Sequence, residues 1–178
     1  MGKNHARVLS NMSSVDELVL YDPLGKDIGE LHGKAVNDNL DSFLGQEFDY
    51  CVVSSPTSTH RDMALKLAAL DVPVLIEKPL AFSVVEALEI SEAFESRGLL
   101  GAVGHIERYN PAIIALREKL ASGILGKIFQ ITTRRVGPYS GRIRDVGVVK
   151  DLATHDIDLV LTISGSAYKS IDAQVSFP

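Results

Sequence analysis

The segment VLIEKPLAFS, Val74 to Ser83, closes an apolar run with a glutamate, a lysine and a proline. The apolar residues Val72–Ile76 predict a short buried strand. Pro79 has no N–H to donate to a strand ladder, so the strand must end before it. Ser83 and Glu86 then have the spacing of a capping box, which predicts that a helix follows at once. A buried strand that leads directly into a helix is typical of a parallel sheet flanked by helices.

The same alternation extends to both sides of this segment. We predict further strands at ELVLYD (17–22), FDYCVVSS (48–55) and LLGAVGHIERY (99–109), and helices at Asn4–Met12, Thr57–Leu70 and Ser83–Gly98. The fold class is therefore α/β, with a Rossmann-type doubly wound parallel sheet over residues 1–105.

After residue 105 the pattern changes. Asn110 and Pro111 predict the start of a helix that ends near Gly123. A strand at 127–137, a helix at 148–165 and a strand at 170–177 follow. We interpret residues 106–178 as the beginning of a second α/β domain with an open sheet.

Both ends of the chain depart from a complete fold. A doubly wound sheet starts with an apolar strand and a glycine-rich turn, whereas here Met1-Gly2 already stands at a helix start. A lone strand ending at Pro178 would have an unpaired edge. We therefore expect that the first strand is missing and that both domains are incomplete.

Composition excludes several classes of protein. The 178 residues are 46% hydrophobic and carry a net charge of -5, without a block of Lys and Arg. We therefore expect neither nucleic acid nor a membrane as partner. The sequence has no signal peptide or apolar span, which predicts a cytoplasmic location. Cys51, the single cysteine, lies in an apolar strand and is interpreted as a buried structural thiol.

Five segments together resemble the Gfo/Idh/MocA family of NAD(P)-dependent oxidoreductases. The resemblance implies a Rossmann domain followed by an α/β domain that often mediates oligomerisation, and hence a homo-oligomer in the full-length form. It also implies a small-molecule sugar or nucleotide-sugar substrate. The segments are GKNHARVLS (2–10), SSPTSTH (54–60), EKPLA (77–81), GHIERYNPA (104–112) and KDLATHDIDL (150–159).

The resemblance implies a set of cofactor-binding residues. Asp22, at the end of a predicted strand, is of the type that binds ribose hydroxyls and disfavours the extra phosphate of NADP, so NAD is the expected cofactor and NADP is disfavoured. Asp22 before Pro23 is equally a turn starter, and Thr57 or Ser58 is equally a helix cap. The cofactor set is Gly2, Asp22, Ser54, Ser55, Pro56, Thr57, His60, Glu77 and Lys78.

The catalytic residues implied by the resemblance are Lys78, His155 and Asp151. Lys78 would pass on the proton that leaves as an alcohol is oxidised, and His155 would act as general base or proton relay. Asp151 and His155 are four apart on a predicted helix and would share one face. Glu77 with Lys78 is alternatively a salt-bridged pair at a strand end, and Asp151 with His155 an ordinary surface pair. No second cluster completes a metal shell, so no metal is expected.

The segment GHIERYNPA looks most similar to family members that oxidise UDP-N-acetylglucosamine or its uronate at carbon 3. The implied substrate residues are His105, Arg108, Asn110, Lys150, Asp151 and His155. Alternatively, Asn110 caps a helix and Arg108 pairs with an acid. The basic loop 134–145 is a further candidate for substrate contact. The expected activity is hydride transfer from a sugar hydroxyl to NAD; the alternatives are a different polyol or inositol dehydrogenase, a catalytically silent fragment, or a sugar-sensing or dimerising module.

Overall fold

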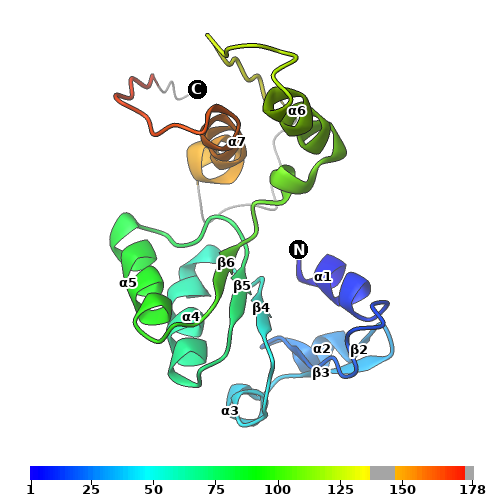
Figure 1. Ribbon diagram of the computed structural model, residues 1–178. Coiled ribbons are helices and arrows are strands. Elements are labelled where there is room, and N and C mark those ends of the chain that lie inside the picture. Colours follow the sequence, from blue (N-terminus) through cyan, green and yellow to red (C-terminus); the bar gives the residue numbers. More distant parts are fainter. Residues whose placement is uncertain (137–146, 175–178) are drawn as a thin grey trace. The chain divides into compact units, whose positions relative to one another are not determined.

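The structure is a computed structural model that describes residues 1–136 and 147–174. The chain divides into two compact units, Met1–Gly104 and His105–Pro178. Within the described ranges, no helix is long and apolar enough to cross a membrane. The two units are described separately below (Figure 1).

The first unit contains a three-stranded parallel sheet in the order β4-β5-β6. Its strands are β4 (Cys51–Val53), β5 (Val74–Ile76) and β6 (Gly101–Val103), with Val53 opposite Ile76 and Ile76 opposite Val103. The 3-10 turn η1 (Thr57–Thr59) and helix α4 (His60–Ala69) connect β4 to β5, and α5 (Val84–Glu95) connects β5 to β6. Because the strands are parallel, the residues that follow all three strands meet at one edge of the sheet.

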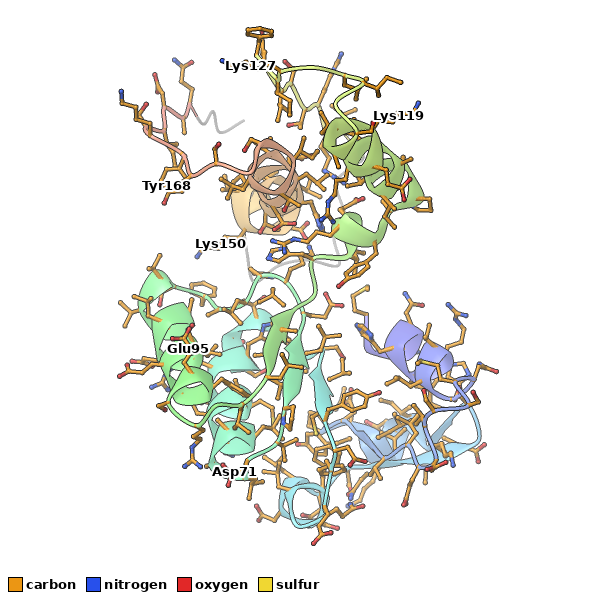
Figure 2. The ribbon with its side chains drawn as sticks, viewed as in Figure 1. Asp71, Glu95, Lys119, Lys127, Lys150 and Tyr168 are labelled. Atoms are coloured by element: carbon orange, nitrogen blue, oxygen red, sulfur yellow. The ribbon has the colours of Figure 1, made fainter. Side chains whose placement is uncertain are left out.

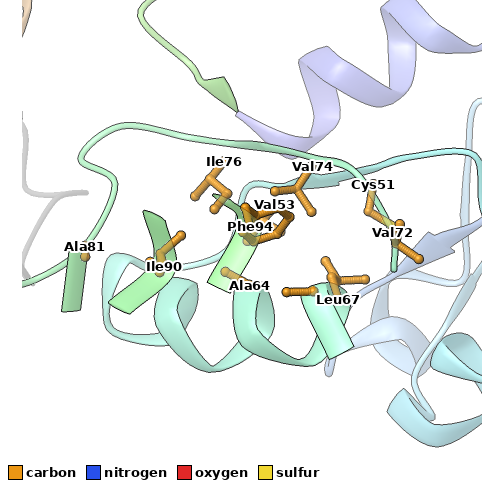
Figure 3. Packing of buried hydrophobic residues seen from close by; sticks show 11 residues of the cluster. Cys51, Val53, Ala64, Leu67, Val72, Val74, Ile76, Ala81, Ile90 and Phe94 are labelled. Carbon is orange, nitrogen blue, oxygen red and sulfur yellow. The ribbon is translucent and has the colours of Figure 1, made fainter. Parts of the chain in front are cut away.

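The core lies between this sheet and the helices α4 and α5 (Figure 3). Apolar side chains from the strands pack against those of the two helices, and each fully buried aliphatic side chain contributes about 1.5–3 kcal/mol. This core holds the carboxyl edge of the sheet in place. Its buried members are Cys51, Val53, Ala64, Leu67, Ala68, Val72, Val74, Ile76, Ala81, Ile90 and Phe94.

A second small sheet has the order β1-β3-β2. Strand β1 (Leu20–Tyr21) is parallel to β3 (Lys34–Asn37), and β2 (Glu30–Leu31) is antiparallel to β3. In a doubly wound sheet of order 3-2-1-4-5-6, the first strand lies between the second and the fourth. In this order, β1, β3 and β4 correspond to the second, third and fourth strands. Within the described residues no strand takes the place of the first, because none pairs with both β1 and β4.

The remaining helices of the first unit are α1 (Gly2–Leu9), α2 (Gly25–Ile28) and α3 (Leu40–Leu44). The sequence predicted α1, but it did not predict α2, α3 or the hairpin of β2 and β3. The predicted capping box is confirmed: Ser83 Oγ accepts from the Glu86 N–H at 3.2 Å, and Glu86 Oε2 accepts from the Ser83 N–H at 3.1 Å. The strand predicted at 99–109 is too long, because the chain leaves the sheet at Gly104 and forms the 3-10 turn η2 (Ile106–Tyr109).

The second unit contains helices and irregular segments, and no strand, over its described residues. It contains η2, α6 (Pro111–Ala121), the π-helical turn η3 (Val149–Ala153) and α7 (Thr154–Ser164). Asn110 caps α6 as predicted, since its Oδ1 accepts from the Ala112 N–H at 3.0 Å. The strands predicted at 127–137 and 170–177 are wrong for the described residues 127–136 and 170–174, where no neighbouring strand pairs with either segment. Residue 137 and residues 175–177 lie outside the described ranges.

Candidate functional site

The carboxyl edge of the β4-β5-β6 sheet gathers polar residues from two loops. Ser54–Thr57 follow β4, and Glu77 and Lys78 follow β5. The Lys78–Pro79 peptide bond is cis. The Glu77 N–H donates to the Val53 carbonyl at 2.9 Å, so this bond continues the pairing of β4 and β5 one residue past the strands. In open α/β sheets ligands bind at this edge.

Helix α1 begins against the end of β4. A Cβ placed on Gly2 would lie 2.9 Å from Ser54 Oγ, closer than a side chain can approach without a shift. Glycine therefore lets the start of α1 approach the serine. The first N–H groups of a helix have no intrahelical acceptor, and with the helix dipole they favour an anion there. The start of α1 and the loop after β4 thus form one surface suited to a phosphate.

Glu77 is a buried carboxylate with a partner on α1. It is 5% exposed, and its Oε1 lies 2.7 Å from His5 Nε2. Its Oε2 accepts from the Lys78 N–H at 3.3 Å. Gly104 passes close beside it, because a Cβ there would meet Glu77 Cα and Oε2 at 3.3 Å. Glu77 therefore pairs with α1 through His5, and it joins α1 to the loop that carries Lys78.

The loop after β4 has its own internal hydrogen bonds. Ser55 Oγ lies 2.7 Å from Thr59 Oγ1, which donates to the Pro56 carbonyl at 2.8 Å. Thr57 is buried and Ser54 half-buried. His60, at the start of α4, is 1% exposed, and its ring nitrogens lie near backbone carbonyl oxygens. Both ring nitrogens of His60 therefore contact the backbone of the first unit.

Asp22 lies at the end of β1, where the sequence placed it. Its Oδ1 accepts from the Leu24 N–H at 2.9 Å, which is the turn-forming contact considered as the alternative. A carboxylate has a second oxygen and further lone pairs, so the turn is compatible with a ribose contact.

One further feature agrees with the sequence predictions. Cys51 is buried, and burial raises the pKa of its thiol to about 11, so it is an inert structural thiol at neutral pH. Within the part of the chain that the structure describes, no group of His, Cys, Asp and Glu side chains could hold a metal ion.

The second unit contains an ion-pair cluster around Asp158, which is 7% exposed. Arg108 donates to it in bidentate fashion, with Nε 2.9 Å from Oδ2 and Nη2 2.5 Å from Oδ1. His105 Nδ1 lies 3.8 Å from Oδ1. Burial lowers the pKa of His105, Arg108 lowers it further, and Asp158 opposes both. Arg135 forms two further ion pairs in this unit, one with Asp156 and one with Glu107.

Lys150, Asp151 and His155 lie on one continuous helical segment (Lys150 is labelled in Figure 2). Lys150 and Asp151 belong to η3, and His155 to the first turn of α7. The Thr154 N–H donates to the Val149 carbonyl, five residues back. A π-turn is wider than an α-turn, so the face shared by Asp151 and His155 is not that of a regular helix; such turns are frequent at functional sites.

Sequence reasoning missed two residues, His5 and Asp158. His5 lies in the segment GKNHARVLS on the first helix, and Asp158 lies one turn after His155. The signal for Asp158 was an acid next to the apolar run of a helix, which requires a buried partner. Residues 137–145 of the basic loop 134–145 lie outside the described residues.

Comparisons with known proteins agree with this geometry. Residues 1–105 match the model of the Gfo/Idh/MocA oxidoreductase family, described by its NAD-binding Rossmann fold. The chain is 35% identical over 128 residues to UDP-N-acetylglucosamine 3-dehydrogenase of Acidithiobacillus ferrooxidans, covering 72% of this chain and 39% of that protein. It is 30% identical over 127 residues to scyllo-inositol 2-dehydrogenase (NAD(+)) of Bacillus subtilis, covering 69% and 37%.

A solved structure shares the fold. Levoglucosan dehydrogenase, in complex with NADH and levoglucosan, has a TM-score of 0.77 at 20% identity, over 93% of this chain and 52% of that one. The matches thus span about half or less of the length of these relatives. Because the family model matches more than half of the residues of this chain, the chain belongs to the Gfo/Idh/MocA oxidoreductase family and has the NAD-binding Rossmann fold of that family.

Proposed function

We propose that the natural full-length protein is an NAD-dependent dehydrogenase that oxidises a hydroxyl group of a sugar or nucleotide-sugar. The observation that carries this proposal is the convergence, at one sheet edge, of the start of α1, the loop after β4 and the loop with Glu77 and Lys78. A second support is the naming of the relatives as dehydrogenases of UDP-N-acetylglucosamine and inositol.

The residues at this edge fit a dinucleotide. The start of α1 beside Ser54 would hold the pyrophosphate, because backbone reaches the site there without a side chain in between. The loop Ser55–Thr57 would run along the cofactor, and Asp22 would bind the ribose, which favours NAD over NADP. Bound NAD supplies the hydride acceptor for the alcohol carbon.

Lys78 is the proposed catalytic residue of the first unit. It follows Glu77, whose carboxylate is held by His5 and by the Lys78 N–H, so the backbone that carries the lysine is fixed on one side. In its neutral form, the Lys78 amine would accept the hydroxyl proton as the hydride leaves the alcohol carbon, and the resulting ammonium group would pass a proton on toward solvent. His155 is proposed as the general base or relay, with Asp151 and Lys150 binding the substrate.

The substrate class rests on the relatives, and a nucleotide-sugar of the UDP-N-acetylglucosamine type, oxidised at carbon 3, is the first choice. The second is a polyol such as inositol, which the Bacillus subtilis relative favours. Both carry secondary hydroxyls on a ring, so the same acid–base residues would serve either.

The test measures NADH formation by the full-length protein with UDP-N-acetylglucosamine, its uronate, myo-inositol and scyllo-inositol. We expect turnover with one of these substrates and at least about a thousandfold loss in Lys78→Ala, within the range for a general acid–base group. Lys66→Ala, an exposed lysine on α4, is the matched control and should keep full activity. Full turnover in Lys78→Ala would overturn the role of this lysine.

A separate measurement addresses the silent-fragment alternative. The 178-residue chain has no strand paired with both β1 and β4 among its described residues, and such a strand would lead into the glycine-rich turn. Calorimetry of this chain with NAD should therefore show binding at least about tenfold weaker than that of the full-length protein. Equal affinity would contradict this expectation.

A further inference from the structure

The ring of His60 lies in the core of the first unit, where it contacts two separate loops. It is 1% exposed. Its Nε2 lies 2.9 Å from the carbonyl oxygen of Ser55, in the loop after β4. Its Nδ1 lies 3.0 Å from the carbonyl oxygen of Pro79 and 3.3 Å from that of Leu80, in the loop after β5. One side chain therefore connects the two loops of the carboxyl edge.

These contacts have a chemical direction. A carbonyl oxygen only accepts hydrogen bonds, so the ring must donate to each loop that it holds. A neutral imidazole donates from one nitrogen, and an imidazolium donates from both. In either protonation state the ring is shielded from solvent, as are Ala64 and Leu67 on the same helix.

The contact with Pro79 bears directly on Lys78. The carbonyl of Pro79 is one residue beyond the lysine, and on the lysine's other side Glu77 is held by His5 and by β4. The backbone of Lys78 is thus fixed from both sides, at Glu77 and at Pro79. A displacement of about 1 Å at a catalytic group can cost about a hundredfold in rate.

We propose that His60, at the start of α4, is a positioning residue that fixes Lys78 for proton transfer by holding the loop after β5 through the contact of its Nδ1 with the Pro79 carbonyl oxygen. This inference rests on the proposed dehydrogenase function. It assigns to His60 a role through Lys78, with no contact to cofactor or substrate.

Three variants of the full-length protein test it. An asparagine amide reaches the place of Nδ1, so His60→Asn keeps a donor toward Pro79. A glutamine amide reaches the place of Nε2, so His60→Gln keeps a donor toward Ser55. We expect kcat to fall at most about tenfold in His60→Asn and about a hundredfold in His60→Gln and His60→Phe. The KM for NAD should change by no more than about threefold, and His32→Asn, on an exposed histidine, should match the parent protein.

A second readout does not need turnover. Reductive ¹³C-methylation followed by NMR gives a signal for Lys78, assigned by its absence in Lys78→Arg. That signal should move in His60→Gln and stay in place in His60→Asn. Equal kcat values in the Asn and Gln variants, or an unmoved Lys78 signal in all three, would overturn the proposal. Absence of turnover in the parent protein would count against the dehydrogenase function alone, and the NMR signal would still decide the role of His60.

Discussion

The pair of His5 and Glu77 gives a prediction whose magnitude follows from the structure. In His5→Leu, the Glu77 carboxylate loses the ring nitrogen at 2.7 Å and keeps the Lys78 N–H at 3.3 Å, while it remains 5% exposed. A hydrogen bond to a charged group contributes about 1.5–3 kcal/mol. Breaking a fully buried pair costs about 3–5 kcal/mol. The side chain of His5 is 21% exposed, so we expect the loss of this pair to cost a free energy near the lower end of these two ranges.

We therefore expect His5→Leu to lower the free energy of unfolding by about 2–3 kcal/mol. Urea unfolding followed by far-UV circular dichroism measures it. With a slope of about 1–2 kcal/mol per molar, the midpoint should fall by about 1–3 M, and the slope should not change.

A double-mutant cycle separates the pair from packing. In a Glu77→Gln background no charge is left behind when His5 is replaced, so the cost of His5→Leu should shrink by about 1–2 kcal/mol. An equal cost in both backgrounds would refute the reasoning, because the loss would then come from the packing of α1 alone. Arg7→Leu, on the exposed side of the same helix, is the control and should change stability by no more than about 0.5 kcal/mol.

Two other perturbations test local features of the first unit. Ser83→Ala removes the cap of α5 and should cost about 1 kcal/mol in urea unfolding, whereas Ser96→Ala at the other end should cost less. Burial raises the pKa of Cys51 from 9.0 to about 11, so between these values the unfolded chain loses its thiol proton first. The free energy of unfolding should therefore fall by up to about 2–3 kcal/mol as the pH rises through this range. Cys51→Ala should lack this part of the decline, and an identical pH dependence in both proteins would contradict a buried thiol.

The fold could be predicted wherever its signal was local. Predictions that depend only on neighbours in the sequence are confirmed. They are the capping box of Ser83, the helix start at Asn110 and Pro111, and the strands β4 and β5. The hairpin of β2 and β3 was missed, because its strands are short and its signal is only the turn at His32 and Gly33, both with positive φ. The strand predicted at 127–137 had the right alternation but, in its described part, no partner to pair with, and a strand requires one.

The candidate site shows the same division. Glu77 and Lys78 could be placed at a sheet edge from sequence, because they directly follow an apolar run. The partners of the buried acids could not be placed, since His5 is 72 residues from Glu77, and Arg108 is 50 residues from Asp158. Such pairs depend on which elements the fold brings together, and the periodicity of one segment carries no information about them.

The contacts of Arg108 limit what the segment GHIERYNPA can specify. Arginine binds a phosphate best through Nε and one Nη, which form a fork, and in Arg108 this fork is taken by Asp158. Turning it toward a nucleotide would leave a buried carboxylate unpaired, at a cost of about 3–5 kcal/mol. Asn110 is likewise used as the cap of α6. These contacts are compatible with either of the two proposed substrate classes, so neither Arg108 nor Asn110 distinguishes a nucleotide-sugar from an inositol.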